Sequence, residues 1–453
     1  MGKEVDNFAG AEKFVFLETF GCQMNENDST RILGALRDIN YSTTDDPVEA
    51  DLIILNTCSV RDRAEHKVYS ALGKFKDLKS RNPGLIIGVA GCVAQSKGTM
   101  LLKRIKHLDL VLGPHNIHRL KAMVLGAGGG KRLASIELTD GIASEEYGYV
   151  PDRASVKASV SIMRGCDNFC TYCIVPYTRG REASRGSAEI IDEVNRLANN
   201  GVKEVTLLGQ NVNSYGKGGS TEASFPELLS MVCGVDGIER VRFLTSHPKD
   251  ISDELIRLFD KEEKLCRHVH LPVQSGSDNI LKAMGRGYTA IGYLKKADAL
   301  RRLYPGISIT TDIITGFPGE TDRDFEDTLS LIRRARFDNS FAFMYSPRPH
   351  TAAESLKGRI PDEIKSSRLH AVQELQREIA FEMNKLLVGR TVSVLVEGRS
   401  KADPEEMSGR TSCNRIVNLS LPHNMAGRII DILINKAYPN SLRGIHEKRS
   451  GLC

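Results

Sequence analysis

The feature of this sequence that most restricts its fold is a repeated alternation of short apolar runs and longer helical patterns. In the first part of the chain the apolar runs are residues 14–19, 51–56 and 85–90, and helical patterns cover residues 28–40 and 61–80. Short, nearly continuous apolar runs are typical of strands that are buried on both faces of a parallel sheet. This order predicts a doubly wound parallel α/β domain, which we assign to residues 12–126.

The alternation resumes after a break and continues through six further strands. The expected strands are residues 158–163, 204–209, 240–245, 268–273, 308–315 and 339–345, and the expected helices are residues 188–200, 225–232, 252–263, 290–302 and 321–336. Six such units predict a partial (β/α)6 barrel. We assign this central domain to residues 151–383.

The break between the two α/β domains is rich in glycine and polar residues. It contains Gly126-Ala-Gly-Gly-Gly-Lys131, which has the composition of a phosphate-binding loop. Such a loop requires Ser or Thr after the lysine and a strand before the first glycine, but Arg132 follows here and no apolar run leads in. We therefore predict a linker over residues 127–150.

The composition changes again after a long amphipathic helical pattern at residues 362–387. Runs rich in β-branched residues follow at 391–396, 414–420 and 428–434, separated by Gly and Pro, and they predict a small all-β barrel over residues 384–447. From residue 384 to the end there are eleven Lys or Arg and six Asp or Glu, a difference of +5 that equals the excess of the whole chain. A small basic barrel with few aromatic residues suits recognition of an RNA backbone.

Three cysteines follow the first expected strand of the central domain at C-x3-C-x2-C spacing, namely Cys166, Cys170 and Cys173. Three thiolates on one tight loop can hold three corners of a [4Fe-4S] cluster. No fourth cysteine lies nearby, so one iron keeps an open position, and open metal positions are where metal sites carry out chemistry. The loop is also expected at the carboxyl ends of the barrel strands, where barrel enzymes keep their active sites.

Two alternatives compete with this hypothesis. A zinc site of three cysteines and a distant histidine would use the same thiols, although zinc motifs usually pair two C-x2-C units or add histidines nearby. A redox-active C-x2-C pair would need only Cys170 and Cys173 and would leave Cys166 without a role.

A second group of cysteines lies in the first domain, where each expected strand runs directly into one. Cys22, Cys58 and Cys92 are 36 and 34 residues apart in sequence. The carboxyl ends of neighbouring parallel strands line one crevice, so these three thiols are expected to converge. Each alone could be a buried core thiol, but core cysteines have no reason to recur at strand ends. The pattern therefore predicts a second cluster.

Polar and glycine residues at other strand ends of the central domain suit a nucleoside-like ligand. We predict Gln210, Ser246, Gln274 and Gly316 as cofactor-binding residues, with ordinary turn chemistry as the alternative for each. His247, His268 and His270 are expected to be hydrogen-bonded structure rather than metal ligands. Three arginines between residues 179 and 185 suit either RNA phosphates or a solvated charged face.

The composition is that of a soluble globular protein, with a net charge of +5 that permits a nucleic-acid partner without requiring one. The first residues lack an apolar signal segment, Asp6 argues against myristoylation, and no apolar run could cross a bilayer. We therefore expect a cytoplasmic protein without a membrane partner. Its ten cysteines then indicate metal ligands and buried thiols, not disulfides, and Cys233, Cys266, Cys413 and Cys453 are expected to be structural.

The cysteine loop and its surroundings, residues 164–182, resemble the methylthiotransferases of the radical SAM superfamily, especially those that act on tRNA. The strings Gly21-Cys-Gln-Met-Asn25 and Asn56-Thr-Cys-Ser-Val-Arg61 resemble the first domain of the same family, and the basic barrel matches its closing TRAM domain. The resemblance implies two [4Fe-4S] clusters. Cys166, Cys170 and Cys173 would hold the catalytic one and bind S-adenosyl-L-methionine at its open iron, with Tyr172 near the adenine; Cys22, Cys58 and Cys92 would hold an auxiliary one.

The resemblance also implies a reaction on tRNA. A 5′-deoxyadenosyl radical would remove hydrogen from C2 of N6-isopentenyladenosine at tRNA position 37. The auxiliary cluster would then supply sulfur, and a second S-adenosyl-L-methionine the methyl group. The partners would be this tRNA and an electron donor such as flavodoxin, and the protein would be a monomer. One departure from the family pattern is His350, which follows Pro347-Arg-Pro349 where relatives commonly have Gly.

Alternative functions remain open from the sequence. A sister methylthiotransferase would act on threonylcarbamoyladenosine of tRNA or on a ribosomal protein. A radical methyltransferase would carry a single cluster, and an iron–sulfur RNA-binding protein would carry out no chemistry. The number of clusters and the modified nucleoside distinguish these alternatives.

Overall fold

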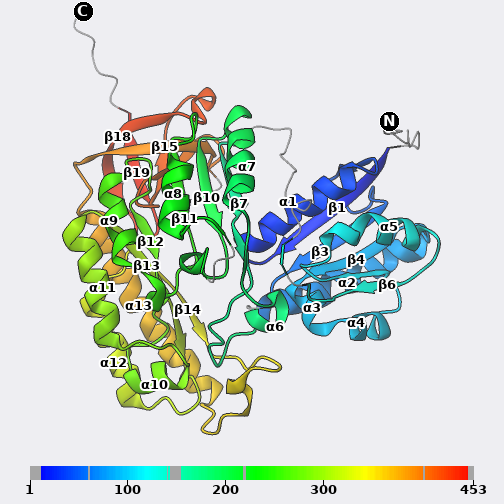
Figure 1. Cartoon of the computed structure of the whole chain (residues 1–453), viewed down its shortest axis with the longest axis horizontal. Helices are drawn as coiled ribbons and strands as arrows, with labels where there is room; N and C mark the ends of the chain where they lie inside the picture. The colour runs from blue at the N-terminus through cyan, green and yellow to red at the C-terminus, as the bar shows by residue number, and fades with distance from the viewer. Residues whose placement is uncertain are drawn as a thin grey trace, which may run out of the picture. The chain divides into compact units, whose positions relative to one another are not determined.

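The computed structural model describes residues 12–59, 62–139, 141–142, 155–217, 221–400 and 403–446. These residues form two compact units (Figure 1). The first contains the described part of the chain before residue 143 together with Met163–Asp167 and Ile174–Arg185. The second contains Asn168–Cys173 and the remaining described residues from 155 onward. The cysteine loop of the central domain is therefore shared between the two units.

The first unit is built on a six-stranded parallel sheet in the order β2-β1-β3-β4-β5-β6. Its strands are β1 Lys13–Phe20, β2 Tyr41–Thr43, β3 Leu52–Thr57, β4 Ile86–Gly91, β5 Leu110–Leu112 and β6 Leu133–Ser135. Its longer helices are α1 Gln23–Arg37, α2 Asp62–Arg81, α3 Cys92–Lys97, α4 Thr99–Arg104 and α5 Leu120–Gly128. One apolar core lies between the sheet and α1 and α5, and a second between the sheet and α2 and α4. The doubly wound parallel fold is thus confirmed.

The first unit differs from expectation at its short elements. α1 begins at Gln23, directly after Cys22, and not near residue 28. Strands β2, β5 and β6 were not expected, and β6 lies inside the segment 127–150 that the sequence predicts as a linker. Residues 140 and 143–150 of that segment lie outside the described residues, as do Asp6 and Cys453.

The second unit contains the six expected parallel strands of the central domain. They are β7 Lys157–Ser161, β10 Glu204–Leu208, β11 Arg240–Phe243, β12 His268–His270, β13 Ser308–Thr315 and β14 Asn339–Met344. They form two three-stranded sheets, β7-β10-β11 and β12-β13-β14, which a parallel bridge between Val241 and Leu265 connects. The helices that accompany these strands are α7 Ser187–Asn199, α8 Phe225–Cys233, α9 Asp253–Lys261, α10 Asp278–Ala283, α11 Ala290–Leu303, α12 Asp322–Ala335 and α13 Asp362–Lys385. The partial barrel is confirmed.

The C-terminal part of the second unit is a closed barrel in the order β15-β16-β17-β19-β18, as the sequence predicts. Its strands are β15 Thr391–Arg399, β16 Met407–Thr411, β17 Ile416–Leu419, β18 Ile429–Ala437 and β19 Leu442–Ile445. Inward-facing aliphatic side chains such as Val394, Val417 and Ile432 are fully buried and form its core. Buried and partly buried residues alternate along β16 and β17, which agrees with strands whose one face points into the barrel core.

Arginine side chains on strand β11 of the central domain hold the small barrel by hydrogen bonds to the main chain of the barrel. Arg240 donates to the carbonyl oxygen of Arg410 at 2.6 Å, and Arg242 donates to those of Thr411 and Ser412 at 3.5 and 3.3 Å. Arg242 also forms a bidentate ion pair with Glu204, at 3.2 and 3.3 Å, and both side chains are buried. Buried charged groups therefore hold the small barrel on the partial (β/α)6 barrel of this unit.

His350 has a backbone conformation that favours glycine, with φ of 70°. This left-handed conformation is strained for residues with a Cβ atom and costs about 1–2 kcal/mol. We therefore expect His350→Gly to raise the melting temperature slightly, because it removes the strain, although added flexibility of the unfolded chain offsets part of the gain. Thermal unfolding checks this, and a lower melting temperature would show that the His350 side chain contributes more than the strain costs.

None of the helices in the described part of the chain combines the length and apolar content that crossing a bilayer requires.

Candidate metal centres

The three strand-end cysteines of the first unit lie at equivalent positions. Cys22 follows β1 and caps the start of α1, Cys58 follows β3, and Cys92 follows β4 as the first residue of α3. Because β1, β3 and β4 are neighbouring parallel strands, their carboxyl ends lie side by side. The Cys22 and Cys58 side chains are hydrogen-bonded to each other, and Cys92 interacts electrostatically with Cys22. The predicted convergence of these thiols is present in the structure.

Glycine and asparagine residues allow the strand ends to pack this closely. A Cβ atom on Gly21 would lie 2.9 Å from Cβ of Cys58, and one on Gly91 would lie 2.4 Å from Oδ1 of Asn56. The buried Asn56 side chain donates to the Asn25 carbonyl oxygen at 2.8 Å, and the Asn25 side chain donates back to Oδ1 of Asn56 at 3.2 Å. The loops that carry the thiols are therefore tied together by polar groups without charge.

Gly91→Ala is expected to disturb this site strongly. Gly91 has φ of 88°, and the added methyl group would contact Asn56 and the Thr57 carbonyl oxygen at 2.4 and 2.6 Å. We expect a loss of about 1–3 kcal/mol in unfolding free energy and of the iron bound in this unit, because Cys92 would move with the backbone. Chemical unfolding and iron content measure both effects.

Gly73→Ala is the matched control for Gly91→Ala. Gly73 lies inside α2, and a Cβ atom there would meet nothing within 4 Å. Alanine in a helix is more favourable than glycine by about 0.5–1 kcal/mol, so this variant is expected to be slightly more stable and to keep its iron. Equal effects of the two variants would contradict the proposed packing constraint.

A buried ion pair lies next to the three thiols. Arg179, at the end of α6 Val175–Arg179, is 4% exposed, and its Nη2 lies 2.6 Å from Oδ2 of Asp28 on α1. Burial disfavours the guanidinium charge, but Asp28 and the Cys92 and Cys22 thiols together raise the pKa of Arg179 above its usual value. Arg179 is therefore a permanent positive charge at this site.

The pKa values of the thiols reflect these neighbours. The pKa of the Cys22 thiol is lowered to about 6, chiefly by the hydrogen bond with Cys58 and also by the charge of Arg179, against the opposing effect of burial. Burial raises the pKa of Cys92, and Arg179 opposes this change through its charge and a hydrogen bond to the Cys92 thiol. The site therefore favours a thiolate at Cys22, which is the form that binds metal.

The arginines after the cysteine loop do not form the exposed group that the sequence suggests. Arg179 and Arg185 are buried, and only Arg181 is well exposed, where it pairs with Asp167 at 3.1 Å. Two of the three arginines are therefore neither a solvated face nor a surface for RNA phosphates. The sequence analysis missed Arg179 as a member of the first thiol site.

The C-x3-C-x2-C loop is held by different parts of the chain on its two sides. In the first unit, the Cys166 N–H donates to the Gly180 carbonyl oxygen at 3.2 Å. In the second unit, Cys170 and Cys173 lie on one turn, because the Cys173 N–H donates to the Cys170 carbonyl oxygen at 2.9 Å. The Thr171 N–H between them donates to the Met284 carbonyl oxygen at 3.0 Å, which fixes this turn beside α10.

Two buried side chains of the second unit donate to the Cys170 sulfur. Nη1 of Arg286 lies 3.4 Å from Sγ of Cys170, and Nε2 of His247 lies 3.9 Å from it. Nδ1 of His247 accepts from the Lys249 N–H at 3.3 Å, so Nε2 carries the hydrogen. Burial and the Arg286 charge lower the pKa of His247 to about 2, so the ring is a neutral donor. Both groups therefore direct an N–H toward the Cys170 sulfur.

Arg286 was not among the predicted site residues. It is 4% exposed and donates to the Tyr172 and Tyr288 hydroxyl oxygens at 3.4 and 2.9 Å and to the Pro272 carbonyl oxygen at 2.7 Å. The only signal in the sequence is its position between Gly285 and Gly287, both of which have positive φ. Arg286 thus connects the cysteine loop to the end of β12.

The predicted cofactor-binding residues lie on loops after consecutive barrel strands. Tyr172 packs on the apolar cluster around Met284 and Phe317, and Gln210 follows β10. Ser246 follows β11, and its buried hydroxyl has no partner among the described residues. Gln274 has φ of 73° and continues the backbone pairing with β13 through Ile313. Their contact with a cofactor stays a prediction.

Gly316 has a packing role in the structure. It has φ of 71°, and a Cβ atom there would lie 2.1 Å from Cγ of Lys365 on α13. Its N–H donates to the buried Glu320 carboxylate at 2.7 Å, and Arg368 of α13 donates to the same carboxylate at 2.7 Å. The glycine is thus required by the contact with α13, and a role in cofactor binding stays a prediction.

The histidines of β12 are hydrogen-bonded to strand β13. The Thr310 hydroxyl lies 2.9 Å from Nε2 of His268 and 3.0 Å from Nδ1 of His270, and Nε2 of His270 lies 3.4 Å from Oδ2 of Asp312. Burial lowers the pKa of His268 well below its usual value. These contacts agree with the structural role that the sequence analysis expects for them.

The donor chemistry of the two thiol groups fits iron–sulfur clusters, which Cys thiolates hold. Within the described ranges, no three His, Cys, Asp or Glu side chains are arranged to hold one metal ion. Each group offers only sulfur donors, and buried arginines that can neutralise an anionic cluster lie beside both.

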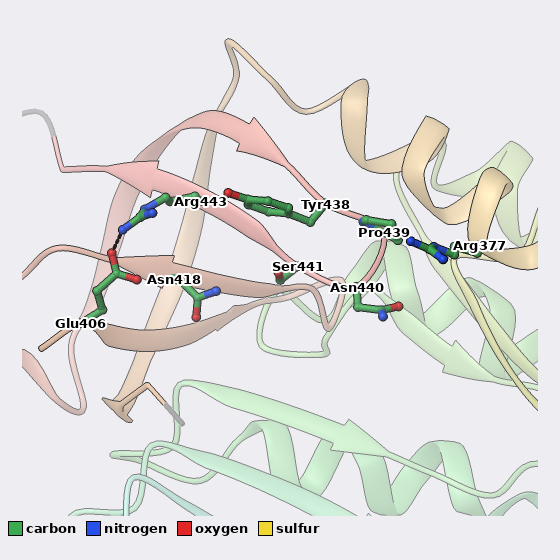
Figure 2. Close-up of a pocket in the computed structure, with 8 residues that line it drawn as sticks. All are labelled: Arg377, Glu406, Asn418, Tyr438, Pro439, Asn440, Ser441 and Arg443. Carbon is green, nitrogen blue, oxygen red and sulfur yellow. Dashed lines mark ion pairs between the residues drawn. The ribbon is translucent and has the colours of Figure 1, made fainter. Parts of the chain in front are cut away.

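A pocket of about 520 Å³ lies between α13 and the small barrel (Figure 2). Arg377 of α13 and Arg443 of β19 line it, and Arg443 is paired with Glu406. Asn418, Tyr438 and Asn440 supply further polar groups. Guanidinium and amide donors of this kind suit a phosphate or a sugar hydroxyl, and the pocket contains no cysteine.

Models of three protein families match the chain in the order of its domains. Uncharacterized protein family UPF0004 matches residues 14–113, the Radical SAM superfamily matches residues 160–332, and the TRAM domain matches residues 385–445. The central match contains all three cysteines of the C-x3-C-x2-C loop. The fold and this loop define a protein of the radical SAM class with two accessory domains.

Named relatives match nearly the whole chain. A tRNA-2-methylthio-N(6)-dimethylallyladenosine synthase of Geobacter metallireducens is 53% identical over 434 residues, which are 96% of this chain and 98% of the relative. The enzyme of the same name from Geobacter sulfurreducens is 50% identical over 95% of this chain and 97% of the relative. The chain belongs to the tRNA-2-methylthio-N(6)-dimethylallyladenosine synthase family.

Solved structures support the fold independently. The radical S-adenosylmethionine methyltransferase TsrM from Kitasatospora setae, with cobalamin and a [4Fe-4S] cluster bound, superposes with a TM-score of 0.54 at 14% identity. The match covers 76% of this chain and 77% of TsrM. The cobalamin-dependent radical enzyme OxsB gives a TM-score of 0.50 at 12% identity, over 81% of this chain and 56% of OxsB. At this identity the likeness concerns the fold alone.

Proposed function

We propose that this protein converts N6-isopentenyladenosine at tRNA position 37 to its 2-methylthio derivative. The relatives that share about half of its residues over nearly their whole length carry this activity in their names. The observation in the chain itself that supports the proposal is the presence of two separate groups of three cysteines. One lies on the barrel loop and the other at the strand ends of the first domain. One cluster alone would suffice for radical formation.

The six cysteines are the proposed ligands. Cys166, Cys170 and Cys173 would hold the catalytic [4Fe-4S] cluster, and Cys22, Cys58 and Cys92 the auxiliary one. When bound, these clusters and S-adenosyl-L-methionine supply the radical chemistry and the sulfur that substitution at an unactivated carbon requires. An acid–base pair would not suffice for that carbon.

The remaining side chains position and neutralise these groups. Arg286 and His247 donate to the Cys170 sulfur, and Arg286 ties Tyr172 to the loop after β12. The donors of Arg286 lower the electron density on that thiolate, as hydrogen bonds to cluster sulfurs do. The small barrel and its pocket, which are basic and polar, would contact the tRNA backbone.

Mass analysis of digested tRNA tests the substrate. Purified protein with reconstituted clusters, a reductant and S-adenosyl-L-methionine is expected to convert isopentenyladenosine to its 2-methylthio form in tRNA that carries the isopentenyl group but no methylthio group. The same tRNA lacking the isopentenyl group is the control and is expected to stay unmodified. Modification of threonylcarbamoyladenosine instead, or of a ribosomal protein, would assign the chain to a sister activity.

Three further expectations accompany the proposal. An external one-electron donor such as flavodoxin would reduce the catalytic cluster, and replacing it with a chemical reductant is expected to support turnover. The protein would act in the cytoplasm, where its tRNA substrate is found, and as a monomer. Light scattering of the protein with and without tRNA measures the last of these, the monomeric state, and a mass of two chains would contradict it.

A further inference from the structure

Arg179 is a buried cation beside the first group of thiols, and the proposed reaction leaves it without a role. Its guanidinium is 4% exposed and lies 2.6 Å from the Asp28 carboxylate. Burying a guanidinium is costly unless charged partners and hydrogen bonds compensate for the lost water. Its position therefore requires an explanation beyond the stability of the fold.

The ion pair orients Arg179 toward the thiols. Oδ2 of Asp28 binds Nη2 of Arg179, while Oδ1 of the same carboxylate lies 3.4 Å from Arg31 of α1. The guanidinium has five N–H donors in a fixed fork, so one side can bind Asp28 while another faces a second acceptor. That acceptor is the Cys92 thiol, and Cys22 also lies close enough to feel the charge.

We propose that Arg179 is the counter-cation of the auxiliary cluster and sets its reduction potential. The inference rests on the proposed function, because it requires a cluster held by Cys22, Cys58 and Cys92. A [4Fe-4S] cluster with three thiolates is anionic, and each added electron increases its negative charge. A nearby guanidinium and a hydrogen bond to a ligand sulfur stabilise the reduced form and raise the potential.

Arg179 is a positioning residue and not a catalytic one, because it acts through the Cys92 sulfur. It also lies six residues after Cys173 in the sequence. The segment that carries the catalytic cysteines therefore also carries the cation of the auxiliary site. Substitutions in this segment can therefore affect residues of both sites.

A redox titration followed by electron paramagnetic resonance tests the inference. The full-length chain with Cys166, Cys170 and Cys173 replaced by alanine carries only the auxiliary cluster, so one midpoint potential is measured. In this background, Arg179→Met is expected to shift the potential to a more negative value. Arg179→Lys keeps the charge and is expected to recover most of the shift.

Arg31→Met is the matched control, because it removes the other arginine from the same Asp28 carboxylate and leaves Arg179 in place. It is expected to keep the potential of the parent protein. If Arg179→Met lowers the iron content, the potential of Arg179→Lys is compared with that of Arg31→Met instead, because both of these variants are expected to keep all of their iron.

Two failures can be told apart. A parent protein that binds no iron in this background would overturn the auxiliary cluster and the proposed function together. A full cluster whose potential is the same in Arg179→Met, Arg179→Lys and the parent would overturn only the role of Arg179. A shift of equal size in Arg31→Met would also contradict it, because the effect would then belong to Asp28.

Discussion

Replacing Cys170 with alanine is expected to abolish cleavage of S-adenosyl-L-methionine, whereas replacing Cys92 is expected to abolish only sulfur insertion. Cys170 is the loop thiol that Arg286 and His247 contact, and Cys92 belongs to the separate group in the first unit. Loss of one ligand of three removes a cluster, so each variant is expected to fall from about eight irons to about four. Release of 5′-deoxyadenosine and mass analysis of the tRNA distinguish the two defects.

Cys233→Ala is the matched control for these two variants. Cys233 is a buried thiol at the end of α8, and burial raises the pKa of its thiol to about 12. Because Cys233 is a core side chain, replacing it is expected to lower the free energy of unfolding slightly. The release of 5′-deoxyadenosine, the modification of the tRNA and the iron content are expected to stay unchanged. If Cys92→Ala also stopped the release of 5′-deoxyadenosine, both with and without tRNA, the assignment of separate roles to the two groups of cysteines would be wrong.

Arg242→Met is expected to destabilise the protein more than any surface substitution of the same kind. The variant leaves Glu204, which is 2% exposed, without the guanidinium that binds both of its oxygens. Removing one partner of a buried ion pair typically costs about 3–5 kcal/mol, because the other charge stays buried. It also removes two hydrogen bonds that hold the small barrel. Urea unfolding followed by circular dichroism measures the loss.

Two comparisons make this prediction specific. Arg336→Met breaks an exposed pair with Glu382, whose side chains are 45% and 60% exposed, and is expected to cost at most about 1 kcal/mol. Adding Glu204→Leu to Arg242→Met is expected to restore part of the stability, since no unpaired charge remains. Equal losses in Arg242→Met and Arg336→Met would show that the buried pair contributes no more than a surface pair.

The sequence predicts the long elements of this fold and misses the short ones. Apolar runs locate β3 and β4 to within one residue, because strands buried on both faces are mostly apolar. β2 and β6 have three residues each, too few to show a period. The first turn of α1 reads Gln-Met-Asn-Glu-Asn, which lacks helical periodicity because Asn25 is buried for hydrogen bonding and not for apolar packing.

The candidate sites follow the same division. The spacing of the six cysteines and their places at strand ends are local features that the sequence displays directly. Arg179 and Arg286 are not visible in this way, because arginine is usually exposed and only long-range partners reveal its burial. Asp28 is 151 residues from Arg179, and Cys170 is 116 residues from Arg286. Such pairs emerge only when the chain is folded.

The docking of the small barrel has a consequence for how such proteins can diverge. Arg240 and Arg242 bind the main-chain oxygens of residues 410–412, and every amino acid supplies the same oxygen. These three hydrogen bonds therefore do not depend on which side chains the barrel carries at these positions, whereas the Ser412 hydroxyl, which accepts from the Arg267 N–H at 2.9 Å, adds a contact that does. Mutations that alter the outer surface of the barrel can therefore accumulate in evolution while these main-chain contacts with the central domain persist.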